Sequence, residues 1–143
     1  LRKTLIKFGG PGYIEPEVKN FPLFDEVVKM TEKAEGIPIG TWLDGTNEGE
    51  KEPEELIELL KSKGIKGITV IPERNWNIKD PYERKIKVEN FHLFMDICKK
   101  MNMPVICGTE MNKFGQPFID DFSQPVLSKY LPYFLESAKS IFL

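Results

Sequence analysis

The sequence holds two clusters of polar side chains that could do chemistry, and each cluster follows directly after a short apolar run. The first is Glu73-Arg74-Asn75, which comes after the apolar letters TVIP and is followed by Trp76. An arginine guanidinium can hold a phosphate or carboxylate in a two-pronged hydrogen bond, and an indole can stack on a ring or exclude water. We therefore expect Arg74 and Asn75 to bind the substrate and Glu73 to be a catalytic residue.

The second cluster is Glu110 with Asn112 and Lys113, which follows the apolar run Pro104–Cys107. Carboxylates at neighbouring strand ends, such as Glu73 and Glu110, suit a hard divalent cation, because Mg²⁺ and Mn²⁺ prefer oxygen ligands. They suit general acid and base catalysis equally well. We expect Glu110 and Asn112 to be catalytic and Lys113 to bind substrate.

Two further strand ends carry weaker candidates. Asp44 directly follows the apolar letters TWL, and it is either a metal ligand or part of a tight turn with Gly45. The glycines of GGPGY, among them Gly10 and Gly12, either form a tight turn or present backbone N–H groups to a substrate anion. The acidic run between Glu48 and Glu55 is expected to be a solvated loop and helix start.

The elements that would position these residues alternate between strand and helix. Four apolar, β-prone runs predict strands at Thr4–Phe8, Ile37–Leu43, Ile65–Ile71 and Pro104–Cys107. Apolar residues at spacings of three and four predict helices over 22–35, 53–64, 81–102 and 125–141. Asp80, followed by proline and by Glu83, is a good N-terminal cap for the third of these helices.

This alternation predicts one α/β domain over residues 1–143, with four βα units and parallel strands. The chain begins at Leu1 and not at methionine, which favours the C-terminal half of a larger TIM-like (βα) barrel. A small doubly wound sheet is the alternative. In both folds the carboxyl ends of the strands form the site, and all the polar clusters fall there.

Composition excludes several classes of protein. The net charge of −2 predicts no attraction to nucleic acid or to an anionic membrane, and no apolar run approaches the length of a membrane span. We therefore expect a cytoplasmic protein with reduced structural cysteines at Cys98 and Cys107. The single histidine, His92, is expected at the surface or core edge, which disfavours a serine nucleophile with a histidine base.

The two polar clusters resemble the later motifs of the PHP family of metal-dependent phosphoesterases. Glu73-Arg74-Asn75 is similar to a Glu-x-Asn strand end, and Gly108-Thr109-Glu110-Met111-Asn112 is similar to a Gly-Ser/Thr-Asp-x-His strand end. The resemblance implies a distorted (βα) barrel in which Glu73 and Glu110 are metal ligands or acid and base groups. It also implies a bound divalent metal (Mn²⁺, Zn²⁺ or Mg²⁺) and a small anionic, phosphorylated substrate.

The chain departs from these motifs at two positions: it has Glu110 in place of the motif's aspartate and Asn112 in place of its histidine. Loss of an imidazole ligand favours a hard cation or a metal-free site. Three functions therefore stay open: a hydrolase, a barrel isomerase or lyase with Glu110 as base, and a non-catalytic binding or assembly domain. For each of them we expect the rest of a barrel, or a second subunit, to cover the open edges of the sheet.

Overall fold

The protein is an α/β structure built on an open, three-stranded parallel sheet in the order β1-β2-β3. The computed structural model describes residues 2–112 and 114–143. The strands are β1 (Ile39–Trp42), β2 (Gly67–Val70) and β3 (Val105–Cys107). Three of the four predicted strands are confirmed, and the alternation of strand and helix is confirmed from β1 onward.

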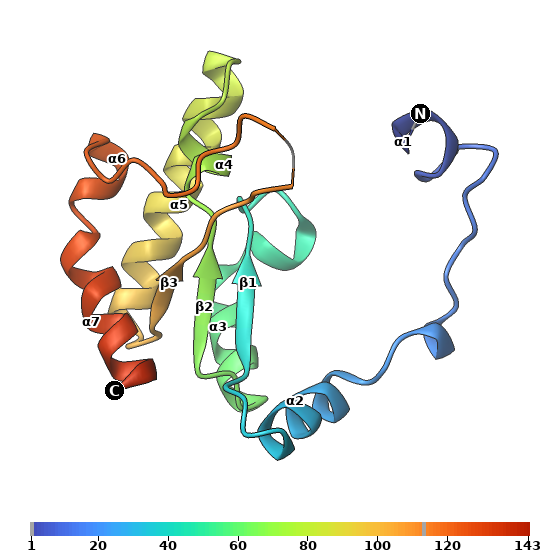
Figure 1. The fold of residues 1–143 in the computed structure, drawn as a ribbon, viewed down its shortest axis with the longest axis horizontal. Coiled ribbons are helices and arrows are strands. Elements are labelled where there is room, and N and C mark those ends of the chain that lie inside the picture. The colour runs from blue at the N-terminus through green and yellow to red at the C-terminus, as the bar shows by residue number, and fades with distance from the viewer. Residues whose placement is uncertain (1, 113) are drawn as a thin grey trace.

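The helices that connect the strands are α3 (Pro53–Ser62), between β1 and β2, and α5 (Pro81–Lys100), between β2 and β3. Helix α5 begins as predicted, because the Asp80 carboxylate accepts a hydrogen bond from the Glu83 backbone N–H at 2.8 Å. Helix α2 (Phe24–Lys33) precedes β1, and α4 (Glu73–Trp76) is a single helical turn directly after β2. Figure 1 shows α3 and α5 together behind the sheet.

The hydrophobic core lies between one face of the sheet and these helices. Trp42 of β1 stacks on Phe94 of α5, with ring centroids 4.3 Å apart and rings nearly parallel. Ile57 of α3 and Val70 of β2 are fully buried in the same cluster. The opposite face of the sheet is less covered: Thr41 is exposed, and Thr69 and Ile106, which are paired with it across the sheet, are half-buried.

The last predicted helix, over 125–141, is divided into α6 (Pro125–Ser128) and α7 (Leu131–Phe142). Pro132 explains the break, because proline lacks the N–H that would continue the first helix and is well accommodated in the first turn of a new one. Helix α7 packs beside β3, where the Tyr133 hydroxyl donates to the Met103 carbonyl at 2.7 Å.

The predicted first strand, Thr4–Phe8, is wrong. The short helix α1 (Arg2–Leu5) is followed by turns, and then by the 3-10 turn η1 (Val18–Asn20). This segment runs away from the sheet (Figure 1). A strand needs a neighbour to satisfy its backbone hydrogen bonds, and here the Gly10 and Gly12 N–H groups donate within the segment, to the carbonyls of Lys7 and Leu5.

The segment exposes large apolar side chains that have no place in the core. Phe8, Ile14 and Val18 are 84%, 87% and 87% exposed. Among the described residues, no helix is both long and apolar enough to cross a membrane. Both cysteines are free, and Cys98 is buried in the core.

Candidate functional site

The two predicted polar clusters meet at the carboxyl edge of the sheet through an ion pair between Arg74 and Glu110. The Arg74 Nη1 atom lies 2.8 Å from Glu110 Oε1, and the two side chains are 35% and 28% exposed. Arg74 lies on α4 after β2, and Glu110 follows β3, so neighbouring strands bring together residues 36 positions apart. Sequence analysis predicted both residues, and the structure places them in contact.

The ion pair lines a polar hollow of about 460 Å³, open to solvent. Other residues that contribute to its wall are Glu73, Asn77, Ile78 and Phe114. The Glu73 carboxylate accepts a hydrogen bond from the Asn77 side chain at 2.9 Å, and Phe114 is fully exposed at the rim. The hollow therefore holds one guanidinium and two carboxylates within reach of a small ligand.

Helix α4 positions Glu73 and Arg74, and Asp120 fixes α4 in place. The buried Asp120 carboxylate accepts hydrogen bonds from the Glu73 backbone N–H at 2.8 Å and from the Trp76 indole N–H at 2.9 Å. Sequence reasoning missed Asp120, because nothing in the letters FIDDF distinguishes it from the exposed Asp121. The only sequence signal is its position within the long segment that follows β3.

Asn75 is completely buried and faces the interior, away from the hollow. Its side-chain amide donates to the carbonyl of Leu43 at 3.0 Å and to that of Ile71 at 3.3 Å, so it joins the ends of β1 and β2. This geometry makes Asn75 a positioning residue for the edge of the sheet, where we had predicted substrate binding. Two buried atoms nearby, Asn75 Oδ1 and Arg74 Nε, have no hydrogen-bond partner within the part of the chain that the structure describes.

Asp44 lies at the end of β1 and is partnered by Lys87 of α5, with 3.2 Å between Oδ2 and Nζ. Burial alone would raise the pKa of the Asp44 carboxyl, but hydrogen bonds from Thr46 and the Lys87 ammonium outweigh it and leave the pKa below its ordinary value. The arrangement contains the predicted tight turn, because Asp44 also accepts from the Thr46 backbone N–H at 3.1 Å.

The acidic run near Asp44 contains one residue that is not a solvated side chain. The Glu50 carboxylate accepts hydrogen bonds from the backbone N–H groups of Leu43, Asp44 and Gly45. Glu50 thus closes the loop after β1, which corrects the expectation for that position. Its carboxylate is held by these donors and does not extend toward the hollow.

The remaining predicted site residues are not brought to the hollow. Gly10 and Gly12 lie in the N-terminal segment, remote from the sheet (Figure 1), and their N–H groups are already used in turns. The Asn112 side chain is exposed and does not line the hollow, while its backbone N–H donates to the Gln116 side chain at 2.9 Å. Lys113 lies outside the described residues.

The predicted metal ligands Asp44, Glu73 and Glu110 do not form one cluster in this structure. Asp44 is paired with Lys87 and Glu110 with Arg74, so these two carboxylates already have cationic partners, while Glu73 accepts a hydrogen bond from the Asn77 amide. Among the described residues, no group of three or more His, Cys, Asp or Glu side chains could hold a metal ion. The bound metal and its ligands therefore stay a prediction.

Comparison with known proteins gave no match: no family model, curated protein or solved structure is significantly similar to this chain. The resemblance to the phosphoesterase motifs therefore rests on the residues quoted for it. The structure places the Arg74 guanidinium beside the carboxylates of Glu73 and Glu110 at the carboxyl edge of a parallel sheet.

Proposed function

We propose that this chain is part of a (βα)-barrel hydrolase that binds a small anionic, phosphorylated substrate at the carboxyl edge of its sheet. The observation that carries the proposal is the partly buried Arg74–Glu110 pair in the wall of a polar hollow. A guanidinium that is partly withdrawn from water binds phosphate more strongly than an exposed one, because less solvent competes for its N–H groups.

The topology supports the barrel part of this proposal. The strands follow one another in sequential order, and α3 and α5 contact each other over one face of the sheet. A barrel has this arrangement, whereas a doubly wound sheet carries helices on both faces. In a barrel, the less covered face with Thr41, Thr69 and Ile106 would face the interior, and further strands would cover the free edges of β1 and β3.

The chemistry follows from an exchange of partners at Arg74. A substrate phosphate that binds Arg74 would displace Glu110 from the guanidinium and leave its carboxylate free to accept a proton from water. The water oxygen would then attack phosphorus, the ester P–O bond would break, and the leaving alcohol oxygen would take its proton from solvent. Glu73, on the same wall of the hollow, would orient the water through its second oxygen.

Steady-state hydrolysis of p-nitrophenyl phosphate tests this function, with and without added Mn²⁺, Zn²⁺ or Mg²⁺, together with metal analysis of the purified protein. Arg74→Gln should raise KM by about tenfold or more, since a charge-assisted hydrogen bond contributes roughly 1.5–3 kcal/mol. Glu110→Gln should lower kcat by about a hundredfold, the usual lower limit for loss of a general base.

The matched control is the ion pair between Lys100 and Glu54, at 2.7 Å, whose side chains are 71% and 54% exposed. Lys100→Gln and Glu54→Gln make the same changes in charge away from the hollow and should leave both kinetic constants unchanged. No hydrolysis under any of the metal conditions, or equal effects of the control and site variants, would refute the proposed function.

A further inference from the structure

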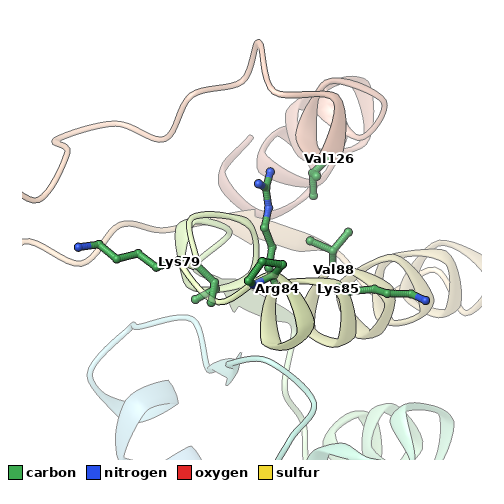
Figure 2. A pocket seen from close by; sticks show the side chains of 7 residues that line it. Lys79, Arg84, Lys85, Val88 and Val126 are labelled. Carbon is green, nitrogen blue, oxygen red and sulfur yellow. The ribbon is translucent and has the colours of Figure 1, made fainter.

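A second hollow, of about 390 Å³, lies at the start of α5 and is lined by Ile78, Lys79, Arg84, Lys85, Val88 and Val126. In Figure 2, Arg84 extends from α5 toward the segment that carries Val126. Lys79 and Lys85 extend outward on either side (Figure 2). Three cationic side chains therefore surround a hollow whose remaining walls are largely apolar.

The charges around this hollow are unbalanced. The Arg84 guanidinium has no hydrogen-bond or ion-pair partner among the described residues, and Lys85 forms a long ion pair with Glu89, at 3.9 Å. The local acids are engaged elsewhere. Asp80 caps α5 through the Glu83 N–H, and the Glu83 carboxylate lies 2.8 Å from Lys87 Nζ. An anionic group would therefore find a cationic partner here without displacing a carboxylate.

The two hollows adjoin, because Ile78 lines both of them. Ile78 is half-buried, so part of its apolar side chain is open to solvent, and it shares the wall of one hollow with Arg74 and the wall of the other with Arg84. An apolar side chain shared by two hollows, each with an arginine in its wall, fits a ligand with two anionic groups joined by a short carbon chain. The chain would cover Ile78 while each end meets one guanidinium.

We infer that the hollow at Arg84 is a second anion subsite, and that the ligand of this protein carries two anionic groups separated by a short carbon chain. This inference rests on the proposed function, because it takes Arg74 as the partner of the first group. Both phosphate and carboxylate ends satisfy the chemistry of the subsite.

Calorimetric titration with three probes tests the inference: butyl phosphate, butanediol bisphosphate and the dicarboxylate adipate. Arg84→Gln should weaken binding of the preferred two-ended probe by about tenfold or more, and leave butyl phosphate within twofold of the unaltered protein. Arg74→Gln should weaken every probe. Lys66→Gln removes an exposed charge at the amino end of β2 and should change none of these affinities.

An Arg84→Gln protein that binds both two-ended probes within twofold of the unaltered protein overturns the inference. Unchanged binding of butyl phosphate to Arg74→Gln overturns the proposed function instead, so the two failures are distinguishable. Arg84 is exposed, and matching circular dichroism spectra will verify that its substitution leaves the fold intact. A tenfold loss for either two-ended probe supports the inference, and the tighter of the two identifies the anionic group.

Discussion

The indole N–H of Trp76 donates to Asp120 Oδ1 at 2.9 Å, across 44 positions of the sequence. The other carboxylate oxygen accepts from the Glu73 backbone N–H, so a single buried side chain ties both ends of α4 to the segment after β3. Arg74 lies between these two attachment points. The geometry of the Arg74–Glu110 pair therefore depends on a residue that does not contact it.

Asp120→Ala should destabilise the protein by about 2–4 kcal/mol, because it leaves three partly buried N–H donors, those of the Glu73 backbone, the Trp76 indole and the Asp121 backbone, without their acceptor. Urea denaturation measures the loss, and phosphate binding to the folded fraction should weaken with it. Asp121→Ala is the control: Asp121 is exposed and accepts local hydrogen bonds from Ser123 and Gln124, so its loss should lower the urea midpoint much less than the loss of Asp120 does. Equal costs for the two variants would contradict the role of Asp120.

The Asp44–Lys87 pair should make stability sensitive to acid. The pKa of Asp44 is below its ordinary value of 3.8 in the folded protein, so the carboxylate stabilises the fold above pH 3.8, and this contribution is lost as the pH falls further. Asp44→Asn should cost about 3 kcal/mol at neutral pH and flatten the acid limb of the stability curve. Urea titrations between pH 7 and pH 3 measure both effects.

The exposed Lys100–Glu54 pair is the control for that measurement, and Glu54→Gln should cost less than about 1 kcal/mol. If Asp44→Asn retains the full acid dependence of the unaltered protein, then other carboxylates cause it and the prediction fails.

His92 should destabilise the fold when it is protonated. Burial lowers its pKa below the ordinary 6.5, and the Lys129 ammonium lowers it further, while the Asp96 carboxylate opposes them. The unfolded chain therefore binds the proton more readily, so stability is complete above pH 6.5 and is lost as the pH falls through that value. His92 Nδ1 also lies 3.1 Å from the Tyr130 hydroxyl, and this contact joins α5 to the start of α7.

His92→Gln should remove the change in unfolding free energy between pH 7.5 and pH 5, measured by urea denaturation. The amide keeps a polar group near Tyr130, so its stability at pH 7.5 should stay within about 1 kcal/mol of the unaltered protein. A variant with an undiminished pH dependence would show that the titrating group lies elsewhere.

Deletion of residues 1–22 should leave the α/β core folded. Among the residues whose burial the structure describes, the hydrophobic core has no member before Val28, and Phe8, Ile14 and Val18 are almost fully exposed. The melting temperature, followed by circular dichroism, should change by no more than about 4 °C, which corresponds to roughly 1 kcal/mol in a domain of this size. Binding of a hydrophobic dye should fall, because the deletion removes exposed apolar surface. Loss of the cooperative transition would contradict this view of the segment.

Local patterns determined much of the fold. The apolar runs predicted β1, β2 and β3, Asp80 predicted the start of α5, and the polar clusters predicted the edge of the sheet that carries the candidate site. These predictions succeed because a helix cap and a buried strand depend on residues within a few positions of one another. The strand expected at Thr4–Phe8 fails because a strand depends on a partner, and the residues alone do not supply one.

The tertiary structure alone decided which polar residues act together. Glu110 meets Arg74, Asp120 holds α4, and Glu50 closes the loop after β1, although the sequence marks Asp120 and Glu50 no differently from their solvated neighbours. The contacts of Asp120 and Glu110 span 47 and 36 positions and form when parallel strands bring their carboxyl ends to one edge, whereas the Glu50 contacts depend on how the loop after β1 folds back on itself. Residue type and spacing therefore established which chemical groups are present at this edge, and the pairing of strands established which of them touch.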